Sequence, residues 1–274
     1  MYRTILVCLN EPRRAAALTR VALAVAERHG AHLVGLHVAP DVFLGVPTEV
    51  SVDYIEQAQK QIEADAAAIQ KTFRDVAGDS GLVTEWRVEL PRGTSYEAAV
   101  SRHARCADLV IAGQPDGAAW RGGDLLTEVL LESGRPILFV PYAGTFERIG
   151  DRVLIAWNGG REAARAAFDA LPLLKEARQV RVLMIDPPRG ATAGLAPADD
   201  LAVALARHGV PIEAARTLSG DVAAGDTLLN AVSEYGADLL VMGCYGHSRL
   251  REMLFGGVTR HILEHMTAPV LMSR

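Results

Sequence analysis

Glycines near the end of the chain are spaced as they are in loops that hold a phosphate group. An apolar run over 237–243 ends at Gly243, a second glycine follows at Gly246, and a Gly-Gly-Val-Thr segment begins at Gly256. Glycine lets main-chain N–H groups approach a ligand closely, and the N-terminus of a helix favours an anion. The Gly-Lys-Ser/Thr of a P-loop is missing, and with it the usual lysine clamp. The sequence therefore predicts an anion site made chiefly of backbone donors.

Two parts of the chain are near copies of one another. Residues 107–113 and 237–243 both read Ala-Asp-Leu, then apolar residues and a glycine, at a separation of 130 positions. The segments at the front of each half, 4–10 and 152–158, match at a separation of 148. A period this long implies two whole domains and excludes a solenoid of short repeats.

Each half alternates segments typical of strands and of helices. In the first half we predict strands at 3–9, 32–38, 82–89, 107–113 and 136–140, and a long helix at 51–77. In the second half we predict strands at 151–157, 179–185, 211–217, 237–243 and 269–273, and helices at 161–176, 197–208, 225–235 and 256–267. Short apolar runs without in/out alternation suit parallel strands that are covered on both faces. The predicted fold is α/β, with two tandem doubly wound domains over 1–143 and 150–274.

Composition limits the class of protein. Of the 274 residues, 50% are hydrophobic and 22% are charged, which favours globular domains over disorder. The net charge is −5 and no cluster of Lys and Arg is dense enough for a row of phosphates, so nucleic acid is not an expected partner. No apolar run approaches the length of a signal-peptide core or a membrane span. We therefore expect a cytoplasmic protein without a membrane partner.

The position of the glycine loop agrees with a ligand site. In open parallel sheets, ligands bind at the carboxyl ends of strands where the strand order reverses. The glycine loop follows the fourth strand of the second half, and the first strand of that half ends in Ala-Trp-Asn-Gly-Gly over 156–160. If these two strands are neighbours, both loops line one crevice that a nucleotide could occupy.

At this point the chain resembles the universal stress protein family in its tandem two-domain form, over nearly its whole length. Nucleotide-binding members of that family carry Gly-x2-Gly-x9-Gly-Ser/Thr after the fourth strand. Gly243, Gly246 and Gly256 match this spacing, whereas Gly257 stands where Ser or Thr is expected. The resemblance implies five strands per domain in the order 3-2-1-4-5, pairing of the domains through their last strands, adenine nucleotide binding, and a regulatory role in the stress response.

The resemblance also assigns roles to residues of the second half, and Asn158 stands where the family more often has Asp. The implied nucleotide-binding residues are Ala156, Trp157, Asn158 and Met184 around the adenine, Met242 and Gly243 at the adenosine, Gly246 and His247 at the ribose and first phosphate, and Gly256, Gly257, Val258 and Thr259 at the outer phosphates. It assigns no catalytic residue and no metal ligand.

Two departures from the family pattern bear on the ligand. Losing the hydroxyl at Gly257 removes one side-chain donor, which is worth about 1–3 kcal/mol if it bonds a charged phosphate. We expect weaker binding, because the backbone donors remain. The first half lacks the Gly-x2-Gly motif, and Asp124 aligns with Gly256, which places a carboxylate where phosphate would lie. The first domain is therefore expected to be a structural partner or to bind something else.

The expected ligand is ATP or AMP, with or without Mg²⁺, and with little or no turnover. Two alternatives stay open at this stage. The first is a scaffold whose glycine loop has lost its nucleotide and which acts through contacts with an unknown protein partner. The second is a slow ATPase or a nucleotidyl-transfer enzyme, because the fold does not decide function. A homodimer of chains is likewise an open alternative.

Cysteine and histidine spacing offers a competing interpretation of the same region. Cys244, His247, His261 and His265 have the spacing of a zinc site, but the phosphate loop already explains their neighbourhood. The three cysteines are scattered and odd in number, unlike a disulfide framework. Cys8 is expected to be an inert thiol in a buried strand. Of the three, Cys244 is the candidate for a redox-sensitive thiol, but an ordinary loop cysteine is the favoured interpretation.

Overall fold

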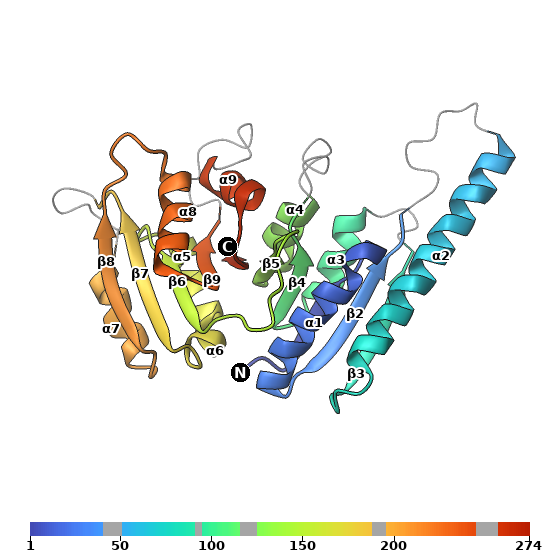
Figure 1. Cartoon of the computed structure of the whole chain (residues 1–274), viewed down its shortest axis with the longest axis horizontal. Coiled ribbons are helices and arrows are strands. Elements are labelled where there is room, and N and C mark those ends of the chain that lie inside the picture. The colour runs from blue at the N-terminus through green and yellow to red at the C-terminus, as the bar shows by residue number, and fades with distance from the viewer. Residues whose placement is uncertain (41–50, 91–94, 116–124, 188–195, 245–256) are drawn as a thin grey trace. The chain divides into compact units, whose positions relative to one another are not determined.

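Strands and helices alternate along the first half of the chain (Figure 1). The computed structural model describes residues 1–40, 51–90, 95–115, 125–187, 196–244 and 257–274, apart from the side chains of 52 and 125–128. The elements of this half are β1 (Thr4–Cys8), α1 (Pro12–His29), β2 (His32–Val38), α2 (Val52–Ala77), β3 (Thr84–Glu89), α3 (Tyr96–Ala104), β4 (Leu109–Gly113), α4 (Leu125–Ser133) and β5 (Ile137–Val140). Each predicted strand of this half is confirmed and begins at most two residues later than predicted.

The second half repeats this alternation. Its elements are β6 (Arg152–Ala156), α5 (Arg161–Asp169), α6 (Leu171–Leu174), β7 (Gln179–Ile185), α7 (Ala198–Ala206), β8 (Ile212–Thr217), α8 (Ala224–Tyr235), β9 (Leu239–Gly243), α9 (Gly257–His265) and β10 (Val270–Ser273). The single helix predicted over 161–176 is wrong in one respect, because the structure breaks it at Ala170. Pro172 lies in the first turn of α6, and proline cannot supply the N–H that would continue the preceding helix.

Strand order confirms the predicted fold class. The order is β3-β2-β1-β4-β5 in the first half and β8-β7-β6-β9-β10 in the second, which is 3-2-1-4-5 in each. The pairs β1–β2, β1–β4 and β2–β3 are parallel, as are β6–β7, β6–β9, β7–β8 and β9–β10. The last strands of the two halves, β5 and β10, pair antiparallel, with Leu138 opposite Leu271. The whole sheet is therefore mixed, although each half contributes a parallel arrangement.

The structure divides into two units whose bounds differ from the halves of the sequence. The first unit consists of Tyr2–Gly113 and α4, and the second unit consists of Gln114 and the chain from Gly134 onward. Gln114 is 4% exposed, and its side-chain amide donates to the carbonyl of Leu263 in α9 at 2.8 Å. Its backbone N–H donates to Val140 of β5 at 2.7 Å, and its Oε1 accepts from the N–H of Tyr142 at 3.0 Å. Gln114 therefore ties α9 to the end of β5 within the second unit.

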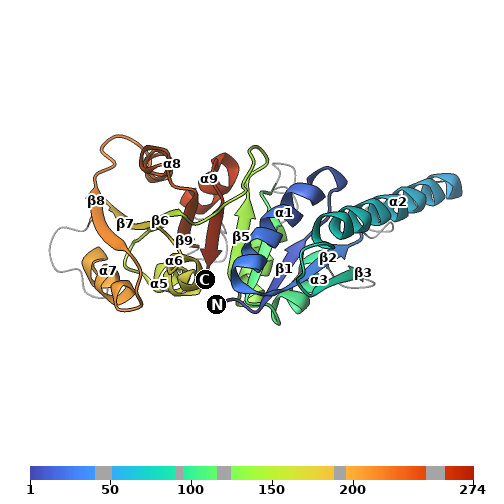
Figure 2. The ribbon, with the colours of Figure 1, turned by 60° about the horizontal axis from the view of Figure 1, so that its bottom comes forward.

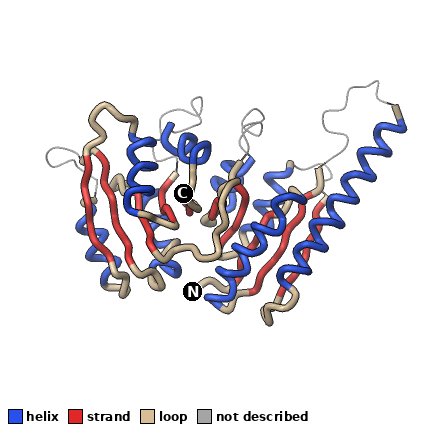
Figure 3. The backbone as a smooth tube through the Cα atoms, in the orientation of Figure 1, coloured by secondary structure: helices blue, strands red, loops and turns tan. Residues whose placement is uncertain are grey.

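Helices cover both faces of the sheet in each unit. In the first unit α1 packs against α2, and α3 packs against α4. Figure 2 shows α1, α2 and α3 of this unit beside its strands. In the second unit α8 packs against α9, while α5 contacts β9 and β10 and α7 contacts β7 and β8. Figure 3 shows the strands in red and the helices in blue. The central strands β1, β4 and β9 are mostly buried, as the runs of apolar residues predict.

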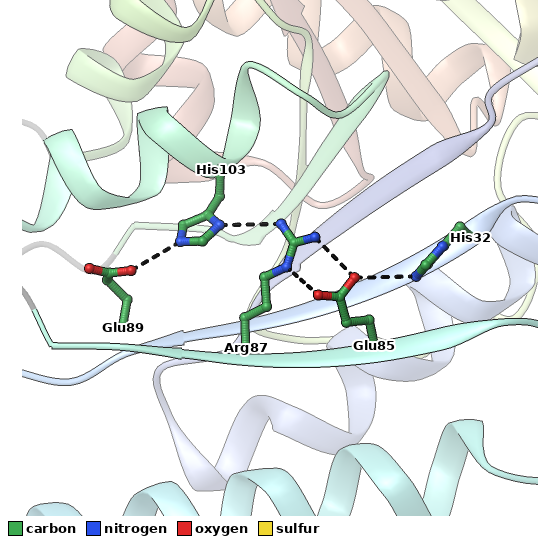
Figure 4. Close-up of polar contacts among 5 residues, drawn as sticks. All are labelled: His32, Glu85, Arg87, Glu89 and His103. Carbon is green, nitrogen blue, oxygen red and sulfur yellow. Dashed lines mark hydrogen bonds and ion pairs between the residues drawn. The ribbon is translucent and has the colours of Figure 1, made fainter.

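A chain of polar and charged side chains links β3 to its neighbours in the first unit (Figure 4). Arg87 donates from Nε and Nη2 to the two carboxylate oxygens of Glu85, at 2.7 and 2.9 Å. Nη1 of Arg87 lies 3.3 Å from Nδ1 of His103 in α3, whose Nε2 lies 3.2 Å from Oε2 of Glu89. His32 of β2 lies 3.6 Å from Glu85. These contacts fasten α3 to the edge strand of the unit.

Candidate functional site

The carboxyl ends of β6, β7 and β9 lie at one edge of the second unit. β6 is flanked by β7 on one side and β9 on the other, and Ala156 is paired in register with Leu183 and Met242. The first and fourth strands of this half are therefore neighbours. The prediction that the loops after these strands line one crevice depends on this arrangement. The loop that leaves β9 and returns at α9 starts from this edge.

Three of the expected adenine residues follow one another at the end of β6. Ala156 is half-buried, Trp157 is 5% exposed, and Asn158 is exposed. The indole Nε1 of Trp157 donates to the carbonyl of Ala196 at 2.8 Å. Oδ1 of Asn158 accepts the N–H of Gly160 at 2.9 Å and so shapes the turn that precedes α5. Asn158 lies at the open edge, whereas Trp157 is enclosed by protein.

The two methionines assigned to the nucleotide belong to the strands themselves. Met184 of β7 is 6% exposed and Met242 of β9 is 5% exposed. Both side chains therefore contribute to the core at the carboxyl end of the sheet. A ligand at this edge would meet only the small exposed part of either side chain.

The described glycines of the motif differ in what surrounds them. A Cβ at Gly243 would come within 2.4 Å of the backbone of Glu162 and Ala163, so the close packing of α5 on β9 requires glycine there. No described atom lies within 4 Å of the corresponding position at Gly257, the first residue of α9. Val258 is 38% exposed, whereas Thr259 is buried. Gly246, His247 and Gly256 lie outside the described residues.

A buried carboxylate at this edge has no counterpart among the expected site residues. The side chain of Glu162, in the first turn of α5, is 6% exposed, and its Oε1 accepts from Nε of Arg161 at 2.5 Å. Burial opposes ionisation, but this bond, a backbone hydrogen bond and the charges of Arg161 and Arg274 outweigh it, so the pKa of Glu162 lies below its ordinary value. The sequence feature that could have indicated Glu162 is the Arg-Glu pair directly after the Gly159-Gly160 turn.

A family model described as the universal stress protein family matches residues 1–140 and 150–274. The chain belongs to this family. The crystal structure of a universal stress protein from Archaeoglobus fulgidus DSM 4304 is similar over 99% of this chain and 96% of its own, at 15% identity and a TM-score of 0.73. A functionally unknown protein from Pseudomonas aeruginosa PAO1 is similar over 99% and 92%, at 14% identity and a TM-score of 0.59. These likenesses support the fold.

A half-length structure also matches. It is a universal stress protein from Archaeoglobus fulgidus in complex with dAMP, at 19% identity over 50% of this chain and 97% of its own, with a TM-score of 0.32. No curated protein matches the chain. Within the described part of this universal stress protein, every helix is too short or too polar to cross a bilayer.

The cysteines of this universal stress protein differ in access to solvent. Cys244 is fully buried, its Sγ donates to the carbonyl of Ser273 at 3.3 Å, and burial raises its pKa to about 12. The interpretation of Cys244 as a redox-sensitive thiol is therefore wrong for the folded chain. Burial likewise raises the pKa of Cys8 to about 12, as expected of an inert thiol. Cys106 is the exposed cysteine.

The histidines with zinc-like spacing have other neighbours. Nε2 of His261 lies 2.8 Å from Oδ1 of Asp226 in α8, and Nδ1 of His265 lies 2.9 Å from the carbonyl of His261. The two imidazole rings stack with centroids 4.4 Å apart. Among the residues that the structure describes, no three histidine, cysteine, aspartate or glutamate side chains gather as a metal site would require.

The corresponding edge of the first unit of this universal stress protein is built differently. If Gly113, the last residue of β4, carried a Cβ, that atom would lie only 2.4 Å from the guanidinium of Arg14 in α1. Asn10 donates from its amide to the hydroxyl of Tyr96. Asp124, the carboxylate that was expected to repel a phosphate, lies outside the described residues. The side chain of Arg14 therefore covers the glycine that corresponds to Gly243.

Proposed function

We propose that this protein is a cytoplasmic regulator of the stress response that binds an adenine nucleotide, ATP or AMP, at the carboxyl edge of β6 and β9. In this proposal Asn158 and the end of β6 meet the adenine, and the amides of the glycine loop and of Gly257 meet the phosphates. Gly243 closes the turn at the end of β9. The other carried-over residues, including Gly246, His247 and Gly256, complete the site.

The observation that supports this proposal best is the adjacency of β6 and β9. It brings the turn at Asn158 and the start of the glycine loop to one edge, where a parallel sheet binds its ligands. Helix α9 returns to that edge with Gly257 as its first residue and no acidic side chain in its first turn. An uncrowded helix N-terminus without a carboxylate favours an anion.

Little or no turnover is expected of this site. The sequence supplies no P-loop lysine to stabilise charge on a transferred phosphoryl group. The nucleotide would therefore act as a signal whose occupancy changes what the protein contacts. The identity of that protein partner, and the formation of a homodimer, remain predictions.

Calorimetric titration of the full chain with ATP, AMP and GMP tests the proposal. We expect saturable binding of ATP or AMP at one site per chain, weaker binding of GMP, and no phosphate release from ATP over hours. Adenine nucleotide found by mass spectrometry in the freshly purified protein would agree. Absence of binding by both ATP and AMP would refute the proposal, and sustained phosphate release would favour the slow ATPase.

The alternative of a ligand-free scaffold has one observation in its favour. Trp157 donates to Ala196, and the N–H of Ala196 donates to the carbonyl of Gly159 at 3.3 Å, so protein covers part of the β6 end. A Trp157→Ala variant removes this cover. If the wild type binds no nucleotide and the variant binds AMP, the wild-type edge is closed and the scaffold alternative is correct.

A further inference from the structure

Arg161 and Glu162 form an ion pair at the proposed nucleotide edge. Arg161 is the first residue of α5, and its Nε donates to Oε1 of Glu162 at 2.5 Å. The two side chains are unequally exposed, 80% for Arg161 and 6% for Glu162. A fixed, buried anion therefore holds an exposed cation beside the end of β6.

Glu162 lies close to residues that follow or end two strands of the sheet, β6 and β9. Its Oε2 is 3.7 Å from the position that a Cβ would take at Gly160, which follows β6. Its backbone lies against Gly243 at the end of β9, and the charge of Arg274, which follows β10, helps to lower its pKa. Glu162 is thus central to the edge where the nucleotide is proposed to bind.

Within the described part of the chain, most donors of the Arg161 guanidinium have no acceptor. The group has five N–H donors, and among the described residues only its Nε has a recorded acceptor, Glu162. A guanidinium whose position is fixed can place its terminal N–H groups on two oxygens of one phosphate. The carboxylate of Glu162 is largely shielded from water, so it fixes Arg161 more firmly than an exposed partner would.

We propose that Arg161, positioned by Glu162, binds a phosphate group of the nucleotide and supplies the positive charge that the missing P-loop lysine would have given. This inference rests on the proposed function and deepens it, because it makes the preferred ligand a phosphorylated nucleotide and not a nucleoside. Arg161 is the binding residue, and Glu162 is a positioning residue.

A second feature of the same edge agrees with a polar ligand. Ser273 of β10 is paired in register with Gly243 and is 1% exposed, and its Oγ has no hydrogen-bond partner among the residues that the structure describes. A buried hydroxyl without a partner is costly unless something fills the position. The ends of β9 and β10 therefore hold a hydroxyl group that a bound molecule or water could satisfy.

Comparing AMP with adenosine isolates the contribution of the phosphate. In titrations of the full chain, Arg161→Gln should weaken AMP binding about tenfold or more and change adenosine binding less than about twofold. Arg161→Lys should weaken AMP binding by an intermediate amount, because an ammonium group keeps the positive charge but cannot donate the two parallel hydrogen bonds of a guanidinium. Glu162→Gln should also lower the ratio of AMP to adenosine affinity, which a purely structural role would leave unchanged.

Arg165→Gln is the matched control, since Arg165 lies one turn further along α5 and pairs with Asp169 at 2.8 Å. It should leave both affinities unchanged. If removing Arg161 alone unfolds the chain by leaving Glu162 buried without its partner, the double variant Arg161→Gln/Glu162→Gln removes both charges and should show the same selective loss.

The two proposals fail in different ways. If the wild type binds AMP and Arg161→Gln binds it equally well, the role of Arg161 is overturned and the nucleotide site stands. Equal weakening of AMP and adenosine would likewise overturn it. If the wild type binds neither compound, the nucleotide proposal fails, and the role of Arg161 fails with it.

Discussion

Nη1 of Arg87 faces Nδ1 of His103 at 3.3 Å (Figure 4). A guanidinium can only donate hydrogen bonds, so Nδ1 of His103 must accept. The imidazole proton is then on Nε2, where it points at the carboxylate of Glu89. The contact between α3 and β3 is therefore specific for one tautomer of His103.

This arrangement predicts the tautomer of His103 in solution. Nitrogen NMR at neutral pH should show the Nε2–H form in the wild type. Arg87→Leu removes the donor to Nδ1 and should give a mixture of the two tautomers. Arg102→Gln should leave the tautomer unchanged, because Arg102 pairs with Glu89 at 2.6 Å and not with Nδ1. A dominant Nδ1–H form in the wild type would contradict the assignment.

Glu89 should make the first unit sensitive to acid. Hydrogen bonds from Arg102 and His103 lower the pKa of Glu89 below its ordinary value of 4.5. A carboxyl group whose pKa is lower in the folded state stabilises the protein above its unfolded pKa and loses that contribution as the pH falls through the folded pKa. Urea unfolding between about pH 5 and pH 3 should therefore show a shallower loss of stability in Glu89→Gln than in the wild type.

Glu147 offers a control for this measurement, because it is exposed and has no recorded partner among the described residues. Glu147→Gln should follow the wild-type dependence on pH. Equal slopes for all three proteins would show that the bonds of Glu89 do not contribute.

Thiol reactivity should single out Cys106. Cys8 and Cys244 are buried with pKa values raised to about 12, whereas Cys106 is exposed. The thiolate is the reactive form, so an aromatic disulfide reagent should modify one thiol per native chain and all three after denaturation. Cys106→Ser should abolish the native reaction. Rapid native modification of Cys244 would show that the end of β9 opens to solvent.

The two described glycines of the motif should respond oppositely to substitution. Gly243→Ala places a methyl group against the backbone of α5, and overpacking of this kind costs about 1–3 kcal/mol in the free energy of unfolding. Gly257→Ser places a side chain where no described atom lies within 4 Å, so stability should change by less than about 0.5 kcal/mol.

Binding should add a second contrast between these positions. Gly257→Ser restores the hydroxyl of the family motif and should tighten AMP or ATP binding, whereas Gly257→Ala, which adds no donor, should not. Urea unfolding and calorimetric titration measure the two effects separately. Unchanged nucleotide binding in Gly257→Ser would mean that the N-terminus of α9 does not contact the phosphate.

Much of the fold follows from local patterns. Apolar runs such as 239–242 indicated strands buried on both faces, and the structure has strands at these positions. The edge strands β3 and β8 are polar and partly exposed, but they too lie within the ranges predicted for them. The break between α5 and α6 was also readable, because Pro172 lies inside the predicted helix. The different bounds of the two units could not be predicted this way, since they depend on contacts of Gln114 with residues about 150 positions away in sequence.

Less of the candidate site follows from the sequence. The spacing of Gly243 and its position after β9 were enough to locate the edge. The burial of individual side chains could not be predicted from the sequence. Glu162, Trp157 and Cys244 are buried in the folded chain, and local sequence does not indicate this. Asn158 and Gly257 were assigned from resemblance, and their binding roles remain predictions.

The antiparallel pair of β5 and β10 and the bond from Gln114 to α9 bear on how the two repeats can evolve. Residues encoded in the first repeat complete the second, so the copies are no longer interchangeable modules. A fragment beginning at residue 150 would lack β5, and its β10 would present an open edge to any strand that could pair with it. Gene fission between the repeats would therefore select for dimers that replace the lost strand.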